Sequence, residues 1–521
     1  MLHQGICGGQ HVRQRSAFQK TQAAPQLQEL FDRAICLDLA DTALRLARQS
    51  GAAYADIRLG RNQRESLFAR EDKLQHASYG LDVGFGVRVL MNGSWGFAGS
   101  SSLTEPEIAR MVALAVEMAQ ANAQIQAEPI TIEDLPAAQE DWVMPVNTDP
   151  FSVATDVKAA YLLAVTGAAL KNGADFCYAM LHFVREEKLF ASSKGSVIFQ
   201  TRLRSAPSFM ATAVDKSAGK FASRDSLAPP MGAGWDYVES CDLVAEAAQA
   251  GTELREKLAA KSVQPGTYDL VVAPSNLFLT IHETVGHSTE LDRALGWEAD
   301  FAGTSFVTPD KLGTLQFGSP LMTVMADRSQ HGGLATVAFD DDGVRTSGAE
   351  FPIVEDGIFK NYQMALGQAR HIGREKSNGC AYCETATAFP IQRMPNISLQ
   401  PNRQTTSLGD LIGGVERGIY IVGAGSWSID QQRDNFQFGG QLFYEISNGK
   451  LGPMLRDVAY QGRTAEFWNS MDRLGDASTY YLGGTFNCGK GQPMQGAPVS
   501  HGAVPARFRG VTVLNTERED I

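Results

Sequence analysis

The chain has 521 residues, of which 44% are hydrophobic and 20% are charged, a composition typical of a folded globular protein. No apolar run approaches the ~18 residues that a membrane-spanning helix needs, so we expect no membrane segment. The 58 acidic residues outnumber the 46 basic ones, giving a formal charge of -12, which argues against nucleic-acid backbone binding as the main activity.

The cysteines and the first residues bear on location. Seven cysteines, an odd number with scattered spacing, do not form the pattern of a disulfide framework and favour a reducing, cytoplasmic setting. Residues 1–26 carry three basic and no acidic residues, but they lack the apolar core of a secretory signal. We expect a disordered tail here, with an organelle-targeting segment as the second interpretation.

The first half of the chain predicts helices flanking an antiparallel sheet. Apolar residues recur at helical spacing in some segments, whereas short alternating runs separated by Gly, Asn and Asp are typical of strands. Asn92-Gly93 is a strong hairpin signal. The expected helices are 27–50, 103–123, 156–172 and 243–261, the expected strands fall within 54–100 and 176–214, and the polar segment 130–150 is expected to be a loop.

The second half is expected to be mainly β. A strand at 267–275 precedes a segment with helical spacing, 276–295, and short strands with Gly-rich turns dominate from about residue 305. Three hairpin-type turns are expected at 341–343, 355–357 and 447–449. The sequence therefore predicts an α+β protein with an N-terminal α/β domain (27–261) and a β-rich domain (262–521) that carries one important helix.

The most informative motif is His282-Glu283-Thr284-Val285-Gly286-His287. The chain has only nine histidines, and chance would give such a pair beside a glutamate about 0.01 times. Two neutral imidazoles with an adjacent carboxylate are typical of a zinc site, in which the carboxylate takes a proton from the attacking water. The alternative is a helix with two incidental histidines.

The five-residue spacing of this pair requires a local distortion. Histidines four apart lie about 40° from each other around an α-helix, but histidines five apart diverge by about 140° and cannot share one ion. A single wide i→i+5 turn removes this divergence, and such turns often occur at functional sites. We therefore predict a π-type widening across Thr284–His287, with Gly286 where crowding is smallest.

A catalytic zinc usually has three protein ligands and one open position, so a third ligand is needed. From the residues alone, the candidates are Glu290, Asp292, Cys488 and His501. Cys488 lies in a Gly-rich segment expected to be a surface loop, where the neighbouring Lys490 would stabilise a thiolate.

At this point the sequence resembles the TldD/PmbA metallopeptidases. The resemblance covers nearly the whole chain after about residue 30 and rests on YADIRLG, GFGVRVLMNGSWGFA, HETVGHSTELD and CGKGQP. The intact His-Glu-x-x-x-His motif is similar to the TldD branch, because the PmbA (TldE) branch has lost it. By resemblance, His282, His287 and Cys488 are zinc ligands and Glu283 is the general base. The resemblance also implies that Glu290 and Asp292 support the ligands, with Asp292 the stronger candidate to orient one of them by a hydrogen bond.

The resemblance also implies a substrate and partners. It implies cleavage of unfolded proteins or peptides inside an enclosed chamber, by a homodimer or a heterodimer with a PmbA/TldE-like subunit. An extended peptide is expected to reach the metal by pairing with a sheet edge. The rival hypothesis is a non-catalytic regulatory or binding subunit of the gyrase-modulator type, with a structural or vestigial metal site.

Overall fold

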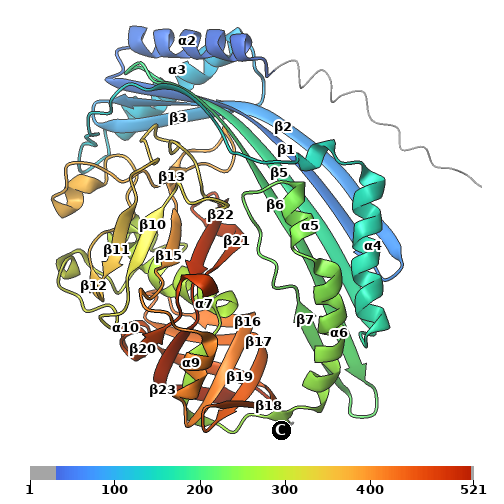
Figure 1. The fold of residues 1–521 in the computed structure, drawn as a ribbon. Coiled ribbons are helices and arrows are strands. Elements are labelled where there is room, and N and C mark those ends of the chain that lie inside the picture. Colours follow the sequence, from blue (N-terminus) through green and yellow to red (C-terminus); the bar gives the residue numbers. More distant parts are fainter. Residues whose placement is uncertain (1–30, 518–521) are drawn as a thin grey trace, which may run out of the picture.

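The computed structural model describes residues 31–517, so the expected tail at residues 1–26 lies outside the described part. The first structural unit is a long, curved sheet of seven strands in the order β3-β2-β1-β5-β6-β4, with β7 paired to β6 (Figure 1). Its strands are β1 (Tyr54–Arg70), β2 (Lys73–Met91), β3 (Ser94–Ser100), β4 (Gln139–Val143), β5 (Phe176–Ser192), β6 (Val197–Asp215) and β7 (Lys220–Asp225).

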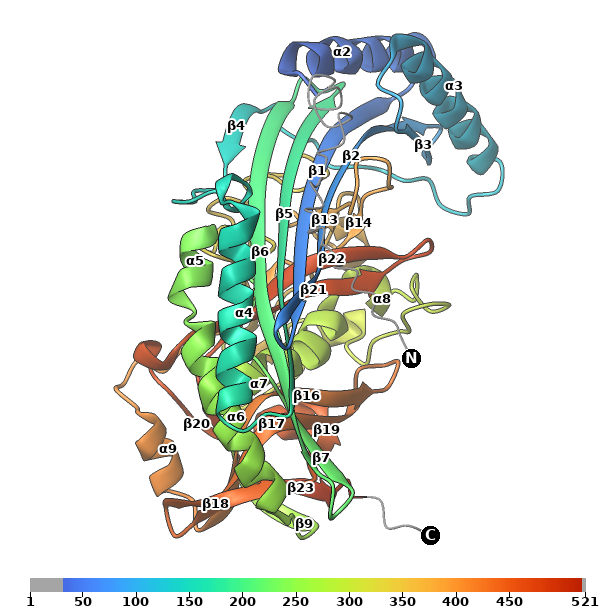
Figure 2. The ribbon, with the colours of Figure 1, turned by 90° about the vertical axis from the view of Figure 1, so that its right-hand side faces the viewer.

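Helices cover one face of this sheet. In β1 the odd-numbered residues Ile57, Leu59, Leu67 and Ala69 are fully buried, and strand alternation places them on the same face. The first two pack beneath α2 (Arg33–Gln49) and α3 (Glu105–Asn122), at one end of the sheet. The last two pack beneath α4 (Thr155–Lys171) and α6 (Leu243–Ala259), at the other end, with the short α5 (Trp235–Ser240) beside them (Figure 2).

The helices and strands expected in the first half of the chain are present, with two differences. The short strands expected between residues 54 and 91 are two continuous strands, β1 and β2, because their pairing runs unbroken over almost the whole length of both. The expected loop at 130–150 contains β4, which lies parallel to β6 and is stabilised by that ladder. The Asn92-Gly93 turn is confirmed between β2 and β3, with φ angles of 51° and 75°.

The second half of the chain is mainly β, as expected. Its largest sheet has eight strands, and because β16 pairs with both β9 and β17, the five strands β16, β9, β23, β19 and β17 close into a barrel. The members of this sheet are β8 (Lys261–Ser262), β9 (Gly266–Val272), β16 (Arg417–Ile429), β17 (Asn435–Ser447), β18 (Lys450–Arg456), β19 (Val458–Arg463), β20 (Met471–Leu474) and β23 (Ala506–Asn515).

Smaller sheets complete this half. A four-stranded sheet runs β12-β11-β10-β15, and two separate pairs are β13-β14 and β21-β22. The turns at 355–357 and 447–449 join β11 to β12 and β17 to β18, as expected. The third expected hairpin turn, at 341–343, joins no two strands and is flanked by a single β-bridge between Phe339 and Arg345. The strands of these smaller sheets are β10 (Val324–Asp327), β11 (Phe351–Glu355), β12 (Ile358–Phe359), β13 (Ala381–Tyr382), β14 (Ile391–Gln392), β15 (Asn396–Leu399), β21 (Tyr481–Lys490) and β22 (Gln495–Ala503). Two short helices, α9 (Leu408–Gly413) and α10 (Thr464–Asn469), lie in the same half.

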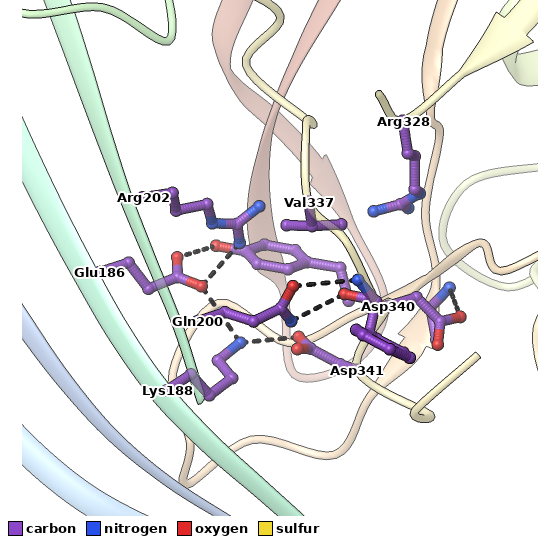
Figure 3. Close-up of a pocket in the computed structure, with 11 residues that line it drawn as sticks. Glu186, Lys188, Gln200, Arg202, Arg328, Val337, Asp340 and Asp341 are labelled. Carbon is purple, nitrogen blue, oxygen red and sulfur yellow. Dashed lines mark hydrogen bonds and ion pairs between the residues drawn. The ribbon is translucent and has the colours of Figure 1, made fainter. Parts of the chain in front are cut away.

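The uncovered face of the first sheet contacts the second half through buried charges. Lys188 on β5 donates to Asp341 at 2.7 Å, and Glu186 accepts from Arg202 on β6 at 2.6 Å. Figure 3 shows these groups around a small pocket between the sheet and loop 337–341. An unpaired buried charge is costly, so separating the two halves would leave Lys188 and Asp341 without each other.

The fold is therefore a mixed α+β architecture, with a helix-covered antiparallel sheet followed by a β-rich region. Within residues 31–517, no helix is both long and apolar enough to cross a membrane. The boundary at 261/262 between two domains stays a prediction.

Candidate metal centre

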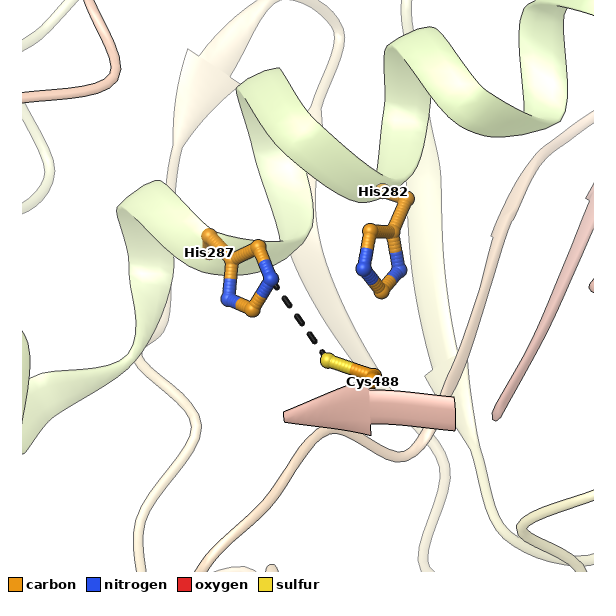
Figure 4. Close-up of side chains that lie close together, drawn as sticks. All are labelled: His282, His287 and Cys488. Atoms are coloured by element: carbon orange, nitrogen blue, oxygen red, sulfur yellow. Dashed lines mark hydrogen bonds between the residues drawn. The ribbon is translucent and has the colours of Figure 1, made fainter. Parts of the chain in front are cut away.

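The helix that carries the histidine motif changes to a wider turn at the histidine pair, as the five-residue spacing requires. The α7 helix (Pro274–Ile281) follows β9 and continues into a π-helical turn, His282–Gly286, and a 3-10 turn, His287–Thr289. The predicted widening is thus confirmed, although it begins two residues earlier than expected. It brings the two imidazoles to the same side, with ring centroids 4.7 Å apart (Figure 4).

Two details of this segment differ from expectation. The helix expected at 276–295 is not continuous, because Glu290 is extended, with a ψ angle of 122°, and forms a bridge with Gln363 before α8 (Leu291–Ala294) begins. Gly286 is needed mainly for packing, since a Cβ there would lie 2.6 Å from the sulfur of Met394.

Cys488 comes from β21 and faces the two histidines. Its Sγ lies 3.6 Å from Nε2 of His287, and the donor atoms of His282, His287 and Cys488 all lie within 4.8 Å of one another. All three side chains are buried, with exposed fractions of 4%, 5% and 6%. The expectation of a surface loop was wrong, because Cys488 lies on a strand paired to Ala497 of β22.

These donors fit a zinc ion. A tetrahedral zinc with Zn–S of about 2.3 Å and Zn–N of about 2.0–2.1 Å separates sulfur from nitrogen by about 3.6 Å, the same as the distance between Cys488 Sγ and His287 Nε2. Among the common divalent ions, zinc is the one most typical of a site that combines thiolate and imidazole ligands. Only three metal-binding side chains meet in this cluster of the described residues, which leaves a fourth position free.

Hydrogen bonds outside the cluster fix which ring nitrogens face it. Nδ1 of His501 lies 3.1 Å from the Ile397 carbonyl oxygen, which only accepts, so this nitrogen carries the proton. Nε2 of His501 then accepts from Nδ1 of His282 at 2.7 Å. The network therefore assigns a free lone pair to Nε2 of His282. His501 is thus a hydrogen-bond partner of a candidate ligand, and Cys488 is the third candidate ligand.

Glu290 orients the imidazole of His287, as His501 orients that of His282. Its Oε2 accepts from Nδ1 of His287 at 3.0 Å and from Nε of Arg293 at 3.1 Å. Asp292, preferred as the supporting group from sequence, forms no hydrogen bond with either histidine and instead pairs with Lys490 at 2.8 Å. Lys490 also lies 3.3 Å from Oε1 of Glu290, so Asp292 acts on His287 through two intermediates.

The protonation states suit metal binding. Burial lowers the pKa of His287 to about 4, despite the opposing effects of Cys488 and Glu290, so its imidazole is neutral at pH 7. Burial alone would raise the pKa of the Cys488 thiol, but contact with His287 and the nearby Arg393 guanidinium hold it below its usual value. Lys490, expected to stabilise this thiolate, points instead to Asp292 and Gln392.

Two arginines complete the centre, and sequence reasoning assigned neither a role there. Arg393 is fully buried and donates to the carbonyl oxygens of both Cys488 and Gln495, so it joins the two strands of the β21-β22 hairpin. Arg433, at the turn between β16 and β17, pairs with the carboxylate of Glu283. Both arginines lie more than 100 residues after the histidine motif in the sequence, so no local pattern could predict either contact.

Comparison with known proteins agrees with this geometry. Residues 265–514 match the model of the PmbA/TldA metallopeptidase C-terminal domain, and residues 55–119 match PmbA/TldA metallopeptidase domain 1, which together cover more than half of the chain. The chain belongs to the PmbA/TldD metallopeptidase family. The resemblance inferred from sequence is thus confirmed, and with it the assignment to an enzyme class, the metallopeptidases.

Individual relatives of this PmbA/TldD member span nearly all of it. A metalloprotease from Methanothermobacter thermautotrophicus is 27% identical over 89% of this chain and 96% of its own length. A zinc metalloprotease TldD homolog from Saccharolobus solfataricus is 24% identical over 83% of this chain and 90% of its own. The structure of TldE from Thermococcus kodakarensis has the same fold, with a TM-score of 0.67 at 15% identity over 92% of this chain and 100% of its own.

Proposed function

We propose that this chain is a zinc-dependent peptidase that cleaves unfolded proteins or peptides, with His282, His287 and Cys488 as the zinc ligands and Glu283 as the general base. The observation that carries the proposal is the meeting of two oriented imidazoles and one thiol beside Glu283, with a fourth position left free. A structural zinc normally has four protein ligands, so a three-ligand set supports a catalytic site over the rival regulatory one.

The protein groups have separate tasks in this scheme. When bound, zinc supplies Lewis-acid polarisation of the peptide carbonyl and makes water a better nucleophile. Glu283 takes a proton from the attacking water and then gives it to the leaving amine. Glu283 directly follows His282 in the chain, is buried like it, and pairs with Arg433, which supports this role.

The strand that carries Cys488 supports an extended substrate. β21 pairs with β22 on one side, and no other described strand pairs with it. An extended peptide can add to such an edge through main-chain hydrogen bonds, which tolerates many side chains but excludes folded proteins. We further propose a dimer, either of this chain alone or with a TldE-like partner, which gel filtration of the purified chain tests.

The peptidase proposal is tested with Glu283→Gln in zinc-loaded protein, using an unfolded polypeptide and its folded counterpart as substrates. We expect the wild type to cleave only the unfolded form, and the variant to keep its zinc but lose at least about 10²-fold in kcat, the usual contribution of a general base. Glu355→Gln, at the exposed end of β11 beside its hairpin turn, is the matched control. Unchanged cleavage by Glu283→Gln would contradict the proposal.

A further inference from the structure

Arg433 occupies a turn position that is costly for an arginine. It lies at the turn between β16 and β17 with a φ angle of 65°, in the left-handed region that favours glycine. The turn is held firmly: the Arg433 carbonyl accepts from Oγ1 of Thr464 at 2.7 Å, and the Gln432 carbonyl accepts from the Phe306 amide at 2.8 Å. Such strained conformations concentrate at functional sites, which suggests that the arginine side chain is needed here.

The side chain of Arg433 points inward to the candidate metal centre. Only 15% of it is exposed, and Nη1 pairs with Oε2 of Glu283. Glu283 directly follows His282 in the chain, so this ion pair brings the guanidinium to the candidate ligand cluster. Its Nε is buried and has no hydrogen-bond partner among the described residues. A buried donor without a partner is costly unless an acceptor arrives later.

We propose that Arg433 is a catalytic residue that binds the oxygen of the scissile carbonyl as it becomes negatively charged; this rests on the proposed function. In that step a bond forms between the water oxygen and the carbonyl carbon. One water proton goes to Glu283, and the carbonyl π electrons move to the carbonyl oxygen. The carboxylate thus loses its negative charge while the substrate oxygen gains one. A fixed cation beside both groups pairs first with Glu283 and then with the oxyanion.

The guanidinium is suited to this exchange because it has five N–H donors in a fixed plane. One of them binds Glu283, while the Nε–H has no acceptor within residues 31–517. The net charge of the site is unchanged by the step, so no further ion has to enter. A lysine offers the same charge but cannot bridge two oxygens with the same geometry.

The test uses Arg433→Gly, since glycine adopts the left-handed conformation without strain and leaves a space that free guanidinium ion can enter. We expect kcat of the zinc-loaded variant to fall by about 10²–10³-fold, the usual effect of losing one oxyanion donor, with zinc content and melting temperature unchanged. Added guanidinium, at concentrations below those that unfold the protein, is expected to restore part of kcat, and Arg433→Lys should remain impaired. Arg463→Ala, which removes an exposed arginine paired with Asp434 near the same turn, is the control.

The possible results are distinct. A fully active Arg433→Gly overturns the role of Arg433 while leaving the peptidase proposal intact. Activity that is lost together with zinc or thermal stability, and that guanidinium does not restore, shows that Arg433 is only a structural counter-ion and overturns the inference. A zinc-loaded wild type that cleaves no peptide overturns the proposed function and this inference together.

Discussion

The imidazole of His501 holds that of His282 through a 2.7 Å hydrogen bond between Nε2 and Nδ1, and the Ile397 carbonyl fixes His501 in turn. This chain of contacts runs from β15 through β22 to the π-helical turn, so elements far apart in sequence orient one candidate zinc ligand. Burial lowers the pKa of His501 well below its usual value, which keeps it neutral and able to accept this bond.

Replacing His501 by leucine is expected to weaken zinc binding about 10–100-fold, because Nδ1 of His282 would be left buried without an acceptor. Competition with a chelator of known affinity measures the change. His76→Leu, at an exposed position on β2, is the control. An unchanged zinc affinity in His501→Leu would show that His282 does not depend on this contact.

Glu290→Gln is expected to be more damaging to zinc binding than Asp292→Asn. Glutamine keeps the shape of Glu290 but removes the charge that faces His287, Arg293 and Lys490, so the buried cations Arg293 and Lys490 each lose a carboxylate partner. Removing one partner of a buried ion pair costs about 3–5 kcal/mol of unfolding free energy, and loss of a ligand's hydrogen-bond partner lowers metal affinity about 10–100-fold.

Chemical denaturation and chelator competition on both variants give the two quantities. Asp292 reaches His287 only through Lys490 and Glu290, so Asp292→Asn is expected to retain tighter zinc binding than Glu290→Gln. The opposite order would mean that Asp292 is the more important supporting group after all.

Lys188→Met tests the contact between the first sheet and the second half of the chain. Lys188 lies 2.7 Å from Asp341 and 3.2 Å from Glu186, all buried. We expect the unfolding free energy to fall by about 3–5 kcal/mol, because Asp341 loses its cation. Lys194→Met, which removes an exposed pair with Asp134, should change it by less than about 0.5 kcal/mol. Equal effects of the two substitutions would contradict the role assigned to the buried network.

The same network predicts loss of stability in acid. Burial alone would raise the pKa of Glu186, but Arg202, Lys188 and Arg204 outweigh it and hold that pKa well below the usual value. A carboxylate with a lowered pKa in the folded state stabilises the fold above its unfolded pKa, about 4.3, and this contribution is lost as the pH falls below it. The unfolding free energy should therefore decrease from about pH 5 downward.

Glu186→Gln is expected to be less stable at pH 7 but to show a shallower decrease in acid, because the group that gains the proton is gone. Urea denaturation of both proteins between pH 3 and pH 7 measures the two slopes. Parallel curves would show that Glu186 does not contribute to acid sensitivity.

The sequence predicted the local features well because they depend on neighbouring residues. The five-residue spacing of His282 and His287 implied a wide helical turn by geometry alone, and the turn is present. The Asn92-Gly93 hairpin and the presence of the first helices follow from local conformational preference and periodicity. The candidate ligand set with Cys488 needed the family resemblance, since nothing in a lone cysteine 201 residues from His287 identifies it as a ligand.

Contacts between distant segments could not be predicted in this way. His501 was one of four possible ligands from its residue type, but its role depends on the register of β22 against β21 and on the carbonyl of Ile397. The pairing of Arg433 with Glu283 depends on where the β16-β17 turn lies in the folded barrel. Glu290, and not Asp292, is the hydrogen-bond partner of His287 because the backbone at Glu290 is extended. No local sequence pattern signals that conformation.

The central claim is that one zinc ion is bound by His282, His287 and Cys488 with a fourth position free. X-ray absorption spectroscopy of the zinc-loaded wild type and of Cys488→Ser tests it most directly. The account predicts one sulfur at about 2.3 Å and two imidazole nitrogens at about 2.0–2.1 Å in the wild type, with the sulfur contribution absent from Cys488→Ser. A wild-type spectrum without sulfur, or one with four protein ligands, would contradict the account.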